Sequence, residues 1–150
     1  MECGFYIFLH TSELDNNSEF MTRLFRQLEV EGDWDCALMD ISFLPTFQQG
    51  ITPPLHVYVC SSMTDVSFVK DKGYQVLRRI PISTISNDAH HTFATPYYMP
   101  VTVHRLTSIA ICFKDPDLEA AKLIGPVACT IHLRPRTKCQ KTSEWRFPRL

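Results

Sequence analysis

The six histidines are the side chains best suited to bind a metal ion or to move a proton. A metal site, including one of the cupin kind, needs histidine and carboxylate ligands that converge from short, fixed spacings. His90 and His91 are adjacent, so on an extended segment they point to opposite faces. The other histidines are isolated, and His132 falls on the polar positions of an alternating segment. The spacing therefore predicts that the chain holds no metal ion.

Nucleophilic catalysis and phosphate binding also lack their usual sequence patterns. No GxSxG element is present, and no cysteine stands in a recognisable catalytic context. The glycines Gly4, Gly32, Gly50, Gly73 and Gly125 are single and far apart, so they form neither a GxGxxG loop nor a P-loop. We therefore expect a protein that is not an enzyme and that needs no cofactor. A small metal-dependent enzyme is the alternative that a tightly bound metal would support.

The C-terminal stretch is the main electrostatic feature of the chain. Residues 134–150 hold six bases against Glu144, a net charge of +5, while the preceding 133 residues hold nine bases and fifteen acids, a net charge of −6. Its cations could neutralise phosphates of a nucleic acid or dock on an acidic protein surface, with its aromatic rings stacking on bases or filling a pocket. The alternative is a solvated terminus. The candidate contact residues are Arg134, Arg136, Lys138, Lys141, Trp145, Arg146, Phe147 and Arg149.

Length and composition indicate one globular domain. The chain has 150 residues, of which 45% are hydrophobic, 11% aromatic and 21% charged, and this excludes the disordered, collagen-like and disulfide-scaffold classes. A formal net charge of −1 indicates no polyanionic partner for the chain as a whole. We expect a domain over residues 1–134 and a basic tail over residues 135–150.

The cysteines and the N-terminus predict an unsecreted, soluble protein. Six cysteines are scattered without a CxxC pair, and four lie in apolar segments, which is typical of free thiols in a reducing compartment. The N-terminal residues 1–9 lack the basic start and the cleavage site of a signal peptide. No apolar run approaches the ~20 residues of a membrane helix. We therefore expect no membrane partner.

Short apolar segments separated by proline and turn residues predict a mostly β fold. The last segment shows the cleanest alternation, with Val127, Cys129, Ile131 and Leu133 on one face. The segment 34–43 is apolar in both phases, which predicts a strand that is covered on both faces. The seven strand candidates are residues 4–10, 34–43, 55–61, 74–82, 92–103, 106–114 and 125–134.

Two segments carry helical signals. In residues 20–30 the side chains of Phe20, Leu24 and Leu28 recur at helical spacing, which favours a helix but leaves a strand open. Asp115, followed by Pro116 and two acids, resembles the start of a short helical insert that ends before Gly125. The predicted core is Phe5, Ile7, Leu9, Trp34, Leu38, Ile41, Val57, Val59, Ile109, Ile111, Ile131 and Leu133.

Two blocks of the chain resemble a viral protein family. Residues 28–45, LEVEGDWDCALMDISFLP, are similar to the block L-x-G-x-W-E-V-A-L-x-E-I-x-Y-P of proteins that Polinton/Maverick elements and adintovirus-like viruses encode. The run from Tyr98-Met99-Pro100-Val101 through residues 106–115 to Ile131-His132-Leu133-Arg134 resembles that family's ending, Y-x-P-V, I-x-I-x-I-x-D and L-H-F-R. The middle of the chain, residues 48–96, carries no matching motif. Cys36 replaces an aliphatic residue of the family pattern, and Asp35 and Asp40 replace glutamates.

The resemblance implies a single jelly roll that serves as the minor capsid, or penton, protein of a double-stranded DNA virus. The seven strand candidates and the segment 20–30 together give the eight strands of an antiparallel jelly-roll sandwich. We therefore expect a capsid subunit of the virion that forms a ring, a homopentamer, at the capsid vertices. Its implied partner is a major capsid protein of double jelly-roll type, and assembly would take place in the nucleus of the host cell. The alternative is a jelly-roll binding module that recognises a host receptor, a glycan or a protein.

Overall fold

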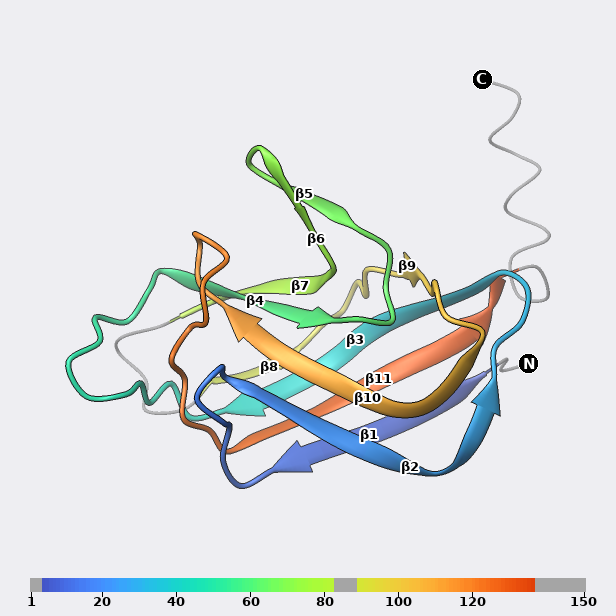
Figure 1. The fold of residues 1–150 in the computed structure, drawn as a ribbon, viewed down its shortest axis with the longest axis horizontal. Coiled ribbons are helices and arrows are strands. Elements are labelled where there is room, and N and C mark those ends of the chain that lie inside the picture. The colour runs from blue at the N-terminus through green and yellow to red at the C-terminus, as the bar shows by residue number, and fades with distance from the viewer. Residues whose placement is uncertain (1–3, 83–88, 137–150) are drawn as a thin grey trace.

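The computed structural model describes residues 4–82 and 89–136, and these form two packed antiparallel sheets (Figure 1). The first sheet contains β1 (Phe5–Thr11), β11 (Val127–Pro135), β3 (Trp34–Phe43) and β8 (Ala89–Thr92) in that order, with β9 (Met99–Pro100) also paired to β3. The second sheet contains β2 (Glu19–Glu29), β10 (Arg105–Lys114), β4 (His56–Ser61) and β7 (Val76–Pro81). A separate hairpin contains β5 (Ser67–Val69) and β6 (Lys72–Tyr74).

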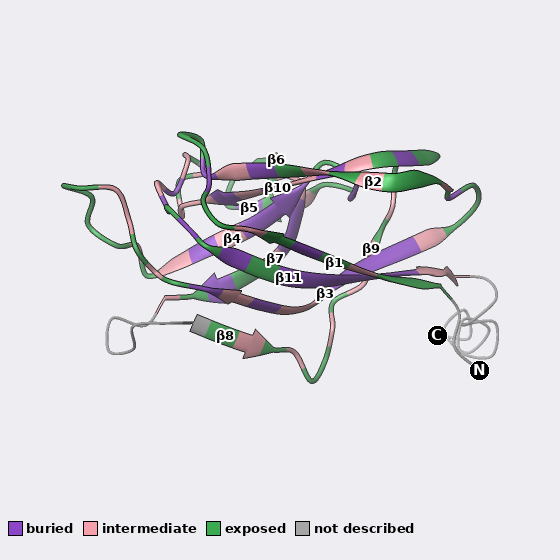
Figure 2. Ribbon diagram, turned by 90° about the horizontal axis from the view of Figure 1, so that it is seen from below, coloured by how far each residue is buried: buried purple, intermediate pink, exposed green. Residues whose placement is uncertain are grey.

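The strand order is that of an eight-stranded jelly roll. Along the chain, β1, β3, β8 and β11 enter the first sheet, and β2, β4, β7 and β10 enter the second, with every pairing antiparallel. The all-β jelly-roll prediction is confirmed. Buried residues line the space between the two layers (Figure 2).

The extra residue in β3 decides which of its side chains reach the core. The register with β11 shifts so that Thr130 faces Asp40 while Ile131 faces Leu38, which leaves Met39 as the bulged residue. Cys36 and Leu38 before the bulge and Ile41 and Phe43 after it are all buried in the core. Apolar residues therefore occupy both odd and even positions of β3 for two reasons. The bulge changes which positions point into the core, and part of the strand is buried on both faces. Both faces are covered only in the first half, where Asp35 and Ala37 are also buried.

The segment that periodicity favoured as a helix is the edge strand β2. Phe20, Leu24 and Leu28 are four residues apart, which is also an even spacing, so on a strand they share one face. Phe20 is buried, and the other two are half-buried against the core. The interpretation as a helix was wrong because a spacing of four satisfies both periods.

The expected helical insert is a non-helical loop. The Asp115 carboxylate accepts hydrogen bonds from the backbone N–H groups of Asp117 and Glu119 at 2.9 and 3.0 Å, as a cap would. Leu118 and Lys122, however, have positive φ angles of 64° and 63°, which interrupt a right-handed helix. The cap signal was therefore correct for a turn and wrong for a helix.

Two of the predicted strands and three of the predicted core residues also differ from the structure. The candidate strand 92–103 was wrong over most of its length, because β8 covers Ala89–Thr92 and meets it only at Thr92, and β9 covers only Met99–Pro100. The candidate strand 74–82 is divided, because β6 ends at Tyr74 and β7 begins at Val76. Phe5, predicted in the core, is 38% exposed. Ile7 and Trp34 are half-buried at the margin of the core, and the other nine predicted core residues are buried. Phe5 and Trp34 stack on each other there, with ring centroids 5.8 Å apart.

The burial of Leu38 predicts that its truncation destabilises the fold, and the exposed Leu55 provides a matched control. Leu38 is fully buried beside Ile131, so Leu38→Ala should lower the free energy of unfolding by about 2–5 kcal/mol. Leu55 is 85% exposed, so Leu55→Ala should change it by less than about 0.5 kcal/mol. Chemical denaturation followed by circular dichroism measures both. Equal effects of the two substitutions would contradict the placement of Leu38.

Candidate interaction surfaces

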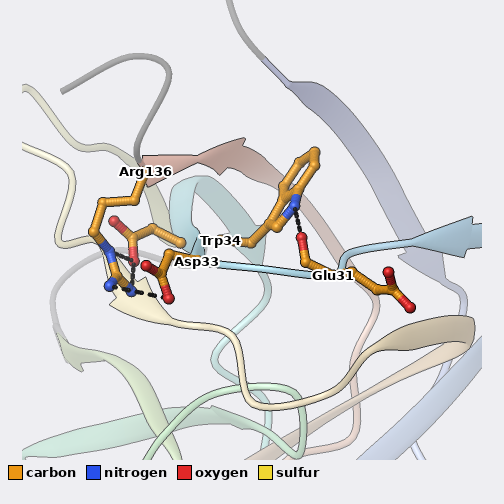
Figure 3. A network of polar contacts seen from close by, with 5 residues as sticks. Glu31, Asp33, Trp34 and Arg136 are labelled. Carbon is orange, nitrogen blue, oxygen red and sulfur yellow. Dashed lines mark hydrogen bonds and ion pairs between the residues drawn. The ribbon is translucent and has the colours of Figure 1, made fainter. Parts of the chain in front are cut away.

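Arg136, one of the predicted partner contacts, binds the body of its own chain (Figure 3). Its Nε and Nη2 atoms donate to Asp35 Oδ1 at 3.0 and 2.7 Å, and its Nη1 lies 4.0 Å from Asp33 Oδ1. Its backbone N–H also donates to the Asp33 carbonyl at 2.7 Å. The Asp35 side chain is only 9% exposed, so the pair is shielded from water on one side. At this point the basic C-terminal stretch therefore binds acidic residues of its own chain.

Arg134, another predicted contact, belongs to an aromatic cluster on the outer face of the first sheet. Its guanidinium carbon lies 3.5 Å from the centroid of the Tyr98 ring. The Tyr98 hydroxyl is hydrogen-bonded to Nδ1 of His132 at 2.9 Å, and the Tyr6 ring stacks on His132 with centroids 4.5 Å apart. His132 is buried beneath these rings although its strand position is polar.

The other six predicted contact residues lie outside the described residues. For them the expectation of contact with a partner stays a prediction. They are Lys138, Lys141, Trp145, Arg146, Phe147 and Arg149.

A hollow of about 490 Å³ lies at one end of the outer face of the first sheet. One row of cross-strand partners runs along it: His10 faces Ala128, Ala128 faces Ser42, and Ser42 faces His90. The two central residues are small and the two histidines stand at the ends, which explains the concave shape. Ser42 Oγ and His90 Nδ1 are hydrogen-bonded. Within residues 4–82 and 89–136, no three His, Cys, Asp or Glu side chains form a group that could hold a metal ion.

The flank formed by β1 and β2 is an apolar groove of about 480 Å³. Each strand is the edge of its sheet, so the seam between the layers is open here, and Figure 2 shows both strands along this side. Ile7, Leu24 and Leu28 pack against the core from this seam. Phe25 and Phe8, which also line the groove, are 95% and 74% exposed. Such an exposed aromatic surface, at two strand edges that no other described strand pairs with, is typical of a protein interface.

The β5–β6 hairpin presents a second exposed apolar surface on the opposite flank (Figure 1). Val66 and Phe68 lie on one face of the hairpin strand and are 55% and 94% exposed. Val69 points the other way into a small buried cluster with Cys60 and Val76. The hairpin is therefore anchored on the second sheet by one face and free to contact another molecule with the other.

Sequence reasoning missed both of these surfaces. Phe25 is an apolar residue among the exposed, mostly polar positions of β2. It is recognised as unusual only when the segment is interpreted as a strand. Val66 and Phe68 lie in the middle of the chain, where no motif directed attention to them.

The four described cysteines are free, as predicted. Cys60 and Cys112 are direct cross-strand partners, and the Cys60 thiol donates a hydrogen bond to the Tyr58 carbonyl at 3.6 Å. Interaction with the adjacent Cys60 thiol, together with the nearby Lys114 ammonium, lowers the pKa of Cys112, while interaction with Cys112 and burial raise the pKa of Cys60. Burial raises the pKa values of Cys36 and Cys129 to about 12. Cys3 and Cys139 lie outside the described residues.

No family model matches the chain, and a search of curated proteins finds no significant match. Across the part of the chain that the structure describes, no helix is long and apolar enough to cross a membrane.

The Arg136 ion pair predicts a measurable contribution to stability. Arg136→Ala leaves the buried Asp35 carboxylate without its charged donors and should lower the free energy of unfolding by about 1–3 kcal/mol. Lys70→Ala is the control, because Lys70 and Asp117 form an ion pair that is 70% and 77% exposed, and its loss should cost less than about 1 kcal/mol. Denaturant unfolding compares the two, and an Arg136 effect no larger than the Lys70 effect would contradict the burial argument.

The cysteine environments predict an order of alkylation. A thiol reacts as its thiolate, so the lowered pKa and partial exposure of Cys112 should make it the first of the four described cysteines to be labelled by iodoacetamide near neutral pH. Cys36 and Cys129 should react only after unfolding. Peptide mass spectrometry of briefly labelled native protein gives the order. Labelling of Cys36 or Cys129 before Cys112 would contradict these environments.

Proposed function

We propose that this chain is a structural capsid protein, the minor capsid or penton subunit of a double-stranded DNA virus related to Polinton/Maverick elements and adintoviruses. The observation that carries the proposal is the pair of exposed apolar surfaces, the β1/β2 groove and the β5–β6 hairpin, on opposite flanks of a jelly roll. A subunit of a ring uses two different surfaces, one for each neighbour. The two sequence blocks that resemble the penton family support the same role.

The proposed role needs no catalytic group and no cofactor. Its chemistry is burial of apolar surface between copies, with five copies forming a vertex ring in the virion. The ring would sit among copies of a major capsid protein of double jelly-roll type, and assembly would take place in the host nucleus. Nucleic acid is a further partner for the cations beyond Arg136.

A binding module for a host receptor, glycan or protein is the second candidate function. The hollow between His10 and His90 supports it, because its volume lies within the range of small-ligand pockets. In this role the protein would act as a monomer, and the hollow rather than the flanks would carry the recognition.

The oligomeric state separates the two candidates. Full-length protein should form a closed ring of five copies at micromolar concentration, measured by native mass spectrometry and light scattering. A version that ends at Arg136 keeps the Asp35 ion pair and should still form the ring, because the apolar flanks are intact. High salt should weaken any contact made by the removed cations more than the apolar contact, since the Debye length at physiological salt is only about 8 Å.

A strict monomer well above micromolar concentration, alone and with the major capsid protein, would overturn the capsid proposal. It would favour the binding module. A version ending at Arg136 that loses the ring would instead place the ring contact in the basic tail.

A further inference from the structure

We infer that the β5–β6 hairpin of one copy inserts Phe68 into the β1/β2 groove of a second copy. This inference rests on the proposed ring and names the surfaces that would form it. The contact is heterologous, because a projecting surface meets a recessed one and the two lie on different parts of the chain.

The hairpin has the construction of a fixed projection. Val69 is buried against the second sheet, and the Gln75 side-chain amide donates to the carbonyls of Ser62 and Thr64, both at 3.0 Å. Val66 lies over Gly73, where an added Cβ would come within 2.6 Å of Val66 Cγ1. Phe68 is therefore held outward on a braced hairpin, and its insertion into a groove would order few additional groups.

The groove has the construction of a receptor for an aromatic ring. Its walls include Phe8 and Phe25, and half-buried Leu24 and Leu28 lie along the seam. A volume of about 480 Å³ accommodates an inserted side chain together with part of its strand. A buried aromatic anchor in an apolar pocket is the usual form of an interface hot spot.

Charge at the rims favours the same contact. The charged residues that line the groove are Arg23 and Arg26, both from β2. The exposed charged residues of the hairpin are the acids Asp65, directly before Val66, and Asp71 at its turn, and the bases Lys70, which is paired with Asp117, and Lys72. The Asp65 carboxylate, three residues before the inserted Phe68, would face the basic rim of the groove and orient the encounter.

The positions of the two surfaces suit a closed ring better than a two-fold dimer. The hairpin projects beyond β7, on the side of the sandwich away from β1 and β2 (Figure 1). When each copy offers its hairpin to one neighbour and its groove to the other, every copy makes the same two contacts. A cyclic assembly then leaves no Phe68 and no groove unfilled.

Phe68→Ser and Phe25→Ser test the contact from its two sides. Both side chains are more than 90% exposed, so the isolated fold should keep its circular dichroism spectrum and melting temperature. Each variant should weaken assembly by about 30-fold or more, measured as the apparent Kd by light scattering over a dilution series. Leu55→Ser removes another exposed apolar side chain outside both surfaces and should assemble like the unmodified protein.

Mixing the two variants tests whether the contact is heterologous. Phe68→Ser keeps an intact groove and Phe25→Ser keeps an intact hairpin, so an equimolar mixture should form one contact and stop at a heterodimer in native mass spectrometry. Normal assembly of either variant would overturn this contact while leaving the ring proposal in place. A monomer of the unmodified protein under every condition would overturn the contact and the ring together.

Discussion

The pairing of β11 with β3 across an extra residue is the constraint on which the rest of the structure depends. Both strands lie inside the first sheet, so the bulge at Met39 sets the face of every residue between Trp34 and Phe43. Without it, Ile41 and Phe43 would point away from the second sheet once Cys36 and Leu38 pointed toward it. The bulge thus gives one strand two runs of core residues. Asp35, next to Cys36 in the first run, lies on the outer face, where Arg136 binds it.

The seam between the sheets is open along β1 and β2 for a related reason. Among residues 4–82 and 89–136, each of these strands has a partner on one side only, and both strands line the same groove. Apolar side chains that face the seam, such as Leu24 and Leu28, are therefore only half-buried. The core extends into the groove, and a partner in the groove would complete it.

The class of fold could be predicted from the sequence because alternation in β11 and β10 and apolar content in β3 are local signals. The nature of β2 could not, because the spacing of Phe20, Leu24 and Leu28 fits a helix and a strand equally. Of the candidate contact surfaces, only the residues that carry charge could be predicted from the sequence. Arg134 and Arg136 stood out as cations, but their contacts with Tyr98 and Asp35 depend on long-range register. Phe25 and Phe68 stood out only after the strands were placed.

The contacts of Arg136 with Asp33 and Asp35 also fix the place where the chain leaves the described fold. In the proposed ring, symmetry would put these exit points on one circle at a single height along the axis. The basic residues of five copies would then act as a multivalent array, in which a partner bound weakly by one copy is met by four more at high local concentration. Avidity of this kind would make the affinity of the assembled vertex for an acidic partner much greater than that of a free subunit.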